Sequence, residues 1–209
     1  MTRYKQERRV FDRLKSDCTV EAKQEYELAI HTLLERYNTT IYENRFVVGG
    51  AVEVFTCALL RVVGIDCTLY GSQATAGDLL LPNDKKLSIK GSFRGLTAIK
   101  LLNQMGEGDR EWATATLFVV SGVGIIFGAP DMVETDHVKA TGDGKSLTSS
   151  GLKHLAENPA NVLAMEIPDK PPTEMAGLSH RASTPVAREV LFETQAQILL
   201  SAFNGQHRM

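Results

Sequence analysis

The chain has 209 residues, of which 43% are hydrophobic, and its formal net charge is −2 at pH 7. This length and apolar content are enough for one domain with a buried core. The near-neutral charge excludes a globally basic nucleic-acid-binding surface, so any surface of that kind has to be a local patch. The three cysteines show no C-x-x-C spacing, which argues against a disulfide framework and a structural zinc site.

The N-terminus is polar and basic, and no stretch of the chain reaches the ~18 consecutive apolar residues of a membrane span. We therefore expect a cytoplasmic protein without a membrane partner. The whole chain is expected to form a single domain. Within it we expect an N-terminal helical segment over 1–43, a core over 44–130, and a C-terminal strand with helices over 131–209.

Helical periodicity dominates the first third of the chain. Apolar residues recur at helical spacing from Thr19 to Asn38, and Thr19 suits a capped helix start. A second helix is predicted from about residue 46 or 50 to residue 63, followed by Gly64 as a stop. This second helix is apolar almost all round and should be buried.

Six short segments rich in β-branched and aromatic residues follow, and they predict a central sheet. Two of these segments carry Asp78 and Lys90, and the other four are 65–70, 96–102, 114–121 and 123–128. Helices, a mixed sheet and further helices in this order predict an α/β or α+β fold, with a central mixed β-sheet flanked by helices.

The last third of the chain is predicted to contain fewer regular elements. The run 135–150 is glycine-containing and charged, which is typical of a surface loop. A short helix over 150–158 and a strand over 161–167 should precede an extended, proline-containing connector over 168–180. A closing helix is expected from about 184 to 203, because Pro185 suits its first position.

Two residues on neighbouring predicted strands carry the strongest chemical signal. Asp78 and Lys90 lie on either side of the turn Pro82-Asn83-Asp84-Lys85-Lys86, so both side chains could project toward one point. An acid that holds a hard divalent cation, beside a lysine that orients a water, is sufficient to cut a phosphodiester. Taken singly, Asp78 also suits a turn-capping acid, and Lys90 also suits a solvent-facing lysine at a sheet edge.

Glu53 is a third candidate, since it lies inside the most apolar helix of the chain. An unpaired charge there is expensive to desolvate, so a cation has to satisfy it or the carboxyl has to become neutral. The alternative is that this helix has a solvent-exposed stripe that carries Glu53, near Arg61.

The order of these residues resembles that of the PD-(D/E)xK nuclease superfamily, and more narrowly that of type II restriction endonucleases. The matching motifs are Gly49-Gly50-x-x-Glu53, Gly77-Asp78 and Ser88-Ile89-Lys90, within a region that covers roughly residues 44–128. The resemblance implies a restriction-endonuclease-like core. It also implies that Asp78 is a metal ligand, that the backbone carbonyl of Ile89 joins the metal shell, and that Lys90 positions or activates the attacking water.

The chain departs from the family pattern at two positions. Gly77 replaces the proline of the motif, and Ser88 stands where an acid is expected. Because serine cannot supply an anionic Mg²⁺ ligand, the missing charge has to come from elsewhere. We favour Glu53 as its source. The second choice is Glu107, which lies just beyond the neutral Gln104 and close to Asp109 and Glu111.

By this resemblance the chain is expected to be a Mg²⁺-dependent, sequence-specific endonuclease acting on double-stranded DNA as a homodimer, with Mn²⁺ able to replace Mg²⁺. A DNA repair or junction-resolving nuclease is the first alternative. The second is a nuclease-fold protein that lost its acid at Ser88 and only binds DNA or another partner. Candidates for DNA contacts are Gln73, Ser92, Arg94, Asn103 and Gln104 for bases, and Lys85, Lys86, Lys139, Lys145, Lys153 and Arg181 for phosphates.

Overall fold

The computed structural model describes residues 2–37, 42–70, 77–103, 111–141 and 144–170. Its α-helices are α1 (Lys5–Asp17), α2 (Val20–Arg36), α3 (Tyr42–Val62) and α4 (Ser149–Glu157). Its strands are β1 (Thr68–Leu69), β2 (Leu79–Leu80), β3 (Lys86–Ser92), β4 (Ile99–Asn103), β5 (Thr116–Val120), β6 (Gly124–Gly128), β7 (Val138–Thr141), β8 (Gly144–Leu147) and β9 (Val162–Ala164). Within these ranges no helix combines the length and the apolar character needed to span a bilayer.

The strands form two sheets. The larger sheet has the order β1-β2-β3-β5-β6-β9, and the smaller sheet has the order β4-β8-β7. In the larger sheet β3 and β5 are parallel, whereas the other neighbouring pairs are antiparallel. The predicted α+β fold with a central mixed sheet is therefore confirmed.

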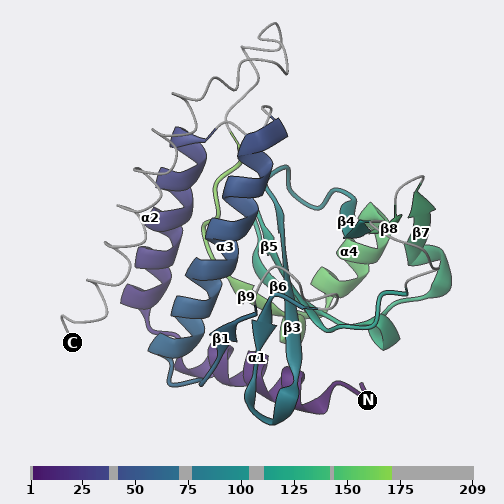
Figure 1. Ribbon diagram of the computed structural model, residues 1–209, viewed down its shortest axis with the longest axis horizontal. Helices are drawn as coiled ribbons and strands as arrows, with labels where there is room; N and C mark the ends of the chain where they lie inside the picture. Colours follow the sequence, from purple (N-terminus) through teal and green to yellow (C-terminus); the bar gives the residue numbers. More distant parts are fainter. Residues whose placement is uncertain (1, 38–41, 71–76, 104–110, 142–143, 171–209) are drawn as a thin grey trace, which may run out of the picture.

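Helices α2 and α3 cover one face of the larger sheet, while α4 and the smaller sheet lie on the other face (Figure 1). Strand β5 is buried along its whole length. Its residues Leu117 and Val119 join the core formed with the first three helices, and Phe118 and Val120 join a second core with Leu152 of α4. The alternation of side chains along one strand thus serves two cores.

Two sequence predictions are wrong in this region. The segment 96–102 was expected in the central sheet, but β4 pairs with β8 in the smaller sheet, where Ile99 lies opposite Leu147. A strand pattern in the sequence does not identify the strand with which it pairs. Strand β9 takes the sixth place in the larger sheet.

The expected surface loop over 135–150 contains the hairpin β7–β8. The residues of β7 are largely exposed, so their polar sequence resembles that of a loop.

The helix predictions agree better with the structure. Thr19 caps α2, because its side chain accepts a hydrogen bond from the N–H of Ala22. The second predicted helix is α3, which begins several residues earlier than expected, at Tyr42. The short helix over 150–158 corresponds to α4. The predicted closing helix over 184–203 and the connector beyond residue 170 lie outside the described residues.

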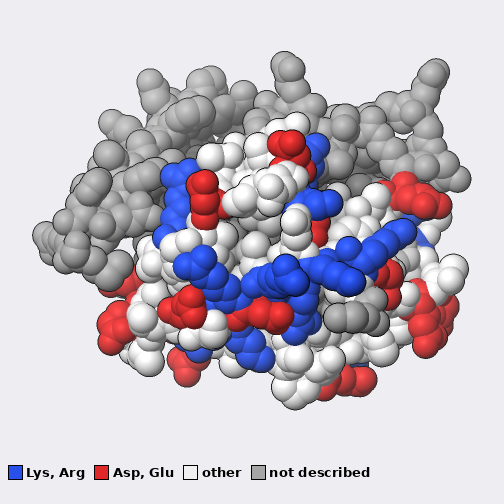
Figure 2. Space-filling view, turned by 90° about the horizontal axis from the view of Figure 1, so that it is seen from below, with Lys and Arg blue, Asp and Glu red and all other residues white. Residues whose placement is uncertain are grey.

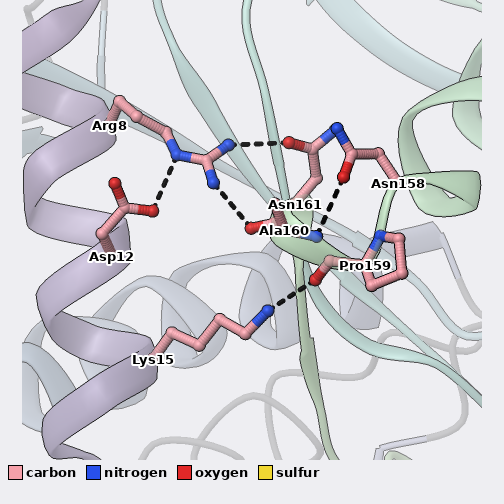
Figure 3. Close-up of polar contacts among 7 residues, drawn as sticks. All are labelled: Arg8, Asp12, Lys15, Asn158, Pro159, Ala160 and Asn161. Carbon is pink, nitrogen blue, oxygen red and sulfur yellow. Dashed lines mark hydrogen bonds and ion pairs between the residues drawn. The ribbon is translucent and has the colours of Figure 1, made fainter.

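Polar contacts attach α1 to the segment between α4 and β9 (Figure 3). The guanidinium of Arg8 donates to Asn161 Oδ1 and to the carbonyl of Ala160, both at 2.7 Å. It also pairs with Asp12 one turn later in α1, and Lys15 donates to the carbonyl of Pro159. These bonds fix α1 at the end of the sheet where β9 begins.

Lysine and arginine side chains form a band across the face seen from below the view of Figure 1, with acidic side chains beside it (Figure 2). Helix α1 runs along this side of the molecule (Figure 1) and contains the ion pairs Arg8–Asp12 at 2.8 Å and Arg13–Asp17 at 3.2 Å. This face therefore carries charges of both signs.

Candidate active site

The carboxylate of Asp78 is the centre of the candidate active site. Its Oδ2 atom accepts hydrogen bonds from Ser88 Oγ at 2.9 Å and from the N–H of Ile89 at 2.5 Å. The ammonium of Lys90 lies 3.3 Å from the same oxygen. The side chains of Lys90 and Asp78 are 26% and 21% exposed, so the pair is partly shielded but still accessible to a substrate.

Local backbone geometry explains the position of Asp78. Its N–H donates to the carbonyl of Leu87 at 2.8 Å, which extends the antiparallel pairing of β2 with β3 by one residue. Gly77 precedes it at a φ of +112°, and a Cβ atom there would meet the Cβ atom of Lys86 at 2.8 Å. Glycine is therefore the residue that fits this position directly before Asp78.

The pleat of β3 places Ser88, Ile89 and Lys90 around Asp78. The N–H of Ser88 donates to Ala115 on the β5 side, so the N–H and carbonyl of Ile89 face the opposite side, toward Asp78. Lys90 lies opposite Phe118 in the register of β3 with β5, which places its side chain on the sheet face that carries the smaller sheet.

Glu53 lies within electrostatic reach of this pair. Burial, followed by the negative charge of Asp78, raises the pKa of its carboxyl to about 7, and the positive charge of Lys90 opposes the shift. Helix α3 packs against β3, which explains how Glu53 comes near residues that follow it by 25 positions or more. The fold thus places Glu53 within electrostatic reach of both Asp78 and Lys90.

These groups form an oxygen-only donor set suited to a hard cation. The carboxylates of Asp78 and Glu53 and the carbonyl of Ile89 are the types of ligand that Mg²⁺ accepts, together with retained waters. Among the described residues, no group of three or more His, Cys, Asp or Glu is placed to hold a metal. An ion held by Asp78 and Glu53 would therefore need the carbonyl of Ile89 and water molecules as its remaining ligands. Ser88, whose hydroxyl donates to Asp78, orients that carboxylate and adds no charge.

The predicted DNA-contact residues are only partly within the described structure. Arg94 is exposed just beyond β3, whereas Ser92 is 7% exposed and its hydroxyl donates to the carbonyl of Gly95. The hydroxyl of Ser92 therefore supports a turn, which argues against the expected base contact. Asn103 is the last residue of β4 in the smaller sheet. Gln73, Gln104, Glu107 and Arg181 lie outside the described residues.

The predicted phosphate-contact lysines occupy two regions. Lys85 is exposed in the turn before β3, and the ammonium of Lys86 lies 4.6 Å from the centre of the Tyr70 ring. The other three are Lys139 on β7, Lys145 on β8 and Lys153 on α4. Those elements lie on the same side of the larger sheet as the side chain of Lys90.

Sequence reasoning did not identify Lys170 or Arg45 as possible site residues. The N–H of Lys170 donates to the carbonyl of Phe93 at 3.0 Å, which holds Lys170 next to Arg94 in space. Burial, followed by the positive charges of Arg94 and Arg45, lowers the pKa of Lys170. We call Arg45, Arg94 and Lys170 the cationic cluster. No sequence motif links these positions, because they come from α3, the chain after β3 and the chain after β9.

No family model matches this chain, and no curated protein or solved structure is significantly similar to it. The geometry of the residues around Asp78 therefore carries the functional interpretation.

Proposed function

We propose that the chain is a Mg²⁺-dependent endonuclease of the PD-(D/E)xK type that hydrolyses phosphodiester bonds in double-stranded DNA. The observation that carries this proposal is the electrostatic coupling of Glu53, Asp78 and Lys90, with Lys90 Nζ 3.3 Å from Asp78 Oδ2. An acid and a lysine in contact, with a second acid of raised pKa beside them, are what metal-assisted phosphodiester hydrolysis requires.

Each residue has a distinct role in this proposal. Asp78, Glu53 and the carbonyl of Ile89 would hold Mg²⁺, which when bound would offset phosphoryl charge and lower the pKa of the attacking water. Lys90 donates a hydrogen bond to that water or to a phosphate oxygen, and so favours the deprotonated nucleophile. Ser88 and the N–H of Ile89 keep the Asp78 carboxylate in one orientation.

The cationic cluster supports an anionic polymer as the substrate. Arg94 follows Lys90 by four positions and is exposed just beyond the end of β3. Arg45, Arg94 and Lys170 would contact a phosphate that flanks the scissile bond. The narrower proposal is a cytoplasmic type II restriction enzyme that acts as a homodimer, because palindromic sites match two-fold symmetry.

Cleavage of supercoiled plasmid DNA in Mg²⁺ tests the proposal. We expect Asp78→Ala and Lys90→Ala each to reduce cleavage by at least about 100-fold, since both act on the reacting groups. The matched controls are Glu25→Ala and Lys5→Ala, which change an exposed acid of α2 and an exposed lysine of α1, helices that carry no candidate residue, and should leave cleavage unchanged. Circular dichroism checks that each variant is folded. Undiminished nicking by a folded Asp78→Ala protein would refute the proposal.

The products of the same reaction distinguish between nuclease classes. Discrete fragments from plasmid or phage DNA are expected of a restriction enzyme. Preferential cutting of branched or damaged duplexes over intact plasmid would instead favour a repair or junction-resolving nuclease.

A non-catalytic DNA-binding protein is the second candidate function. The observation that favours it is Ser88, which donates to Asp78 where an acid would add a second charge. Calorimetric titration with Mn²⁺ or Ca²⁺ separates the two candidates. An endonuclease should bind the ion in the wild-type chain and lose that binding in Asp78→Ala. A chain without an Asp78-dependent ion site would fit the second candidate.

A further inference from the structure

Two of the three cysteines face each other in the buried part of the molecule. Cys57 lies in α3 and Cys67 lies directly before β1, and their side chains are almost fully buried. Their Sγ atoms are 3.6 Å apart, and each thiol also lies near the backbone carbonyl of the other residue. A disulfide requires a separation of about 2.05 Å, so a side-chain movement of about 1.6 Å would bring the two sulfur atoms to bonding distance.

The surroundings of the two thiols favour a thiolate and a thiol side by side. The hydrogen bond from Cys67, helped by the positive charge of Arg61, lowers the pKa of Cys57, whereas the same hydrogen bond raises the pKa of Cys67. Arg61 lies one turn after Cys57 in α3, and its Nε donates to the carbonyl of Cys67 at 2.8 Å. A thiolate next to a thiol that keeps its proton is the reactive arrangement for disulfide formation.

We propose that Cys57 and Cys67 are a site of oxidative modification, at which a peroxide converts the two thiols into a disulfide. The thiolate of Cys57 attacks one oxygen of the peroxide, which breaks the O–O bond, forms a sulfenic acid and releases the other oxygen as hydroxide. The sulfur of Cys67 then displaces the sulfenic oxygen as water and gives up its proton. In total, two thiols lose two electrons and two protons, and hydrogen peroxide becomes two molecules of water.

The position of the pair connects this modification to the candidate active site. Cys57 follows Glu53 by one helical turn, so the two residues lie on the same side of α3. Cys67 precedes β1, whose partner β2 begins directly after Asp78. A disulfide would therefore tie the helix that carries Glu53 to the strand pair that positions Asp78. The pair itself and its chemistry do not depend on the proposed nuclease activity.

Peptide mapping of the full chain tests the proposal directly. The reduced protein is treated with hydrogen peroxide at increasing ratios, the remaining thiols are alkylated under denaturing conditions, and the chain is digested with trypsin. Because Arg61 lies between the two cysteines, trypsin places them in separate peptides, and a disulfide joins these into one species that dithiothreitol separates. We expect this species to form in the wild-type chain and in Cys18→Ser, and to be missing from Cys67→Ser.

A thermal melt gives a second readout on the same samples. The disulfide closes a short loop between positions 57 and 67, so the oxidised wild-type chain should unfold about 5–10 °C above the reduced chain. Cys18 is partly exposed and serves as the control cysteine. The proposal is overturned if Cys57 and Cys67 both remain alkylatable after peroxide treatment, or if they are oxidised singly to sulfinic acid. Because the mapping uses the wild-type chain, it does not depend on the folding of any variant.

Discussion

Glu53 is the residue at which the apolar helix α3 and the polar candidate site meet. Its carboxyl has a pKa of about 7, chiefly because of burial and secondly because of the charge of Asp78. In the unfolded chain the carboxyl has an ordinary pKa of 4.5. Between pH 4.5 and 7 the folded state therefore holds more protons than the unfolded state, and stability falls as the pH rises through this window.

We expect Glu53→Gln to remove this loss in the metal-free protein. At pH 8 the variant should be more stable than the wild type by about 1–2 kcal/mol, a value reduced for solvent screening because the side chain is only half-buried. At pH 5 the difference should be much smaller, because the wild-type carboxyl is then largely protonated. Urea unfolding at both pH values in the presence of a chelator measures the effect.

The control for this prediction is Glu111→Gln, which changes an exposed glutamate. It should leave the pH dependence of stability unchanged. A Glu53→Gln variant with the same pH dependence as the wild type would show that the Glu53 carboxyl is not desolvated in solution.

At the scale of elements, α1 is the helix whose docking depends most clearly on polar contacts. It contributes Phe11 and Leu14 to the core, but most of its other side chains are exposed. Arg8 adds two hydrogen bonds to the segment before β9, and its guanidinium lies over the rings of Phe11 and Phe127. The guanidinium therefore joins α1 both to the polar segment and to the aromatic core.

We expect Arg8→Ala to lower the free energy of unfolding by about 1–3 kcal/mol, because it leaves the Asn161 and Ala160 oxygens without this donor. Arg9→Ala removes an exposed arginine from the same helix and should change stability by less than about 0.5 kcal/mol. Urea denaturation followed by circular dichroism measures both values. Equal effects of the two substitutions would contradict the docking role of Arg8.

At the scale of the whole molecule, the two cores share the strands of the larger sheet. Strand β5 places Leu117 in the core of α1–α3 and Phe118 in the core of α4. Trp112, the single tryptophan of the chain, lies in the second core and packs edge-on against Phe118. Loss of either core exposes one side of the same strand.

We therefore expect the two cores to unfold together. Fluorescence of Trp112 reports on the core of α4, and far-ultraviolet circular dichroism reports mainly on α1, α2 and α3. In urea, the two signals should give coincident transitions with one midpoint. A fluorescence midpoint clearly below that of circular dichroism would mean that the part around α4 unfolds independently, and would contradict the expected single domain.

The sequence determined those features that depend on local chemistry. The capping hydroxyl of Thr19, the apolar pattern of α3 and the β-branched residues of β5 each specify an element without reference to distant residues. The pairing of Asp78 with Lys90 was predictable for the same reason, because one short turn fixes the relation between β2 and β3. The proximity of Glu53 to that pair was an expectation from the order of motifs, and the packing of α3 on β3 places Glu53 within electrostatic reach of both residues.

Only the tertiary structure decided which distant segments meet. The partner of β4 is β8, which lies more than forty positions further along the chain, and periodicity does not encode such a pairing. The strand character of β7 likewise depends on its pairing with β8. The cationic cluster brings together three segments that share no motif, and the contact of Cys57 with Cys67 follows from where α3 ends relative to β1. The sequence supplies the chemical groups, but the sheet order and the helix packing decide which of those groups lie close enough to interact.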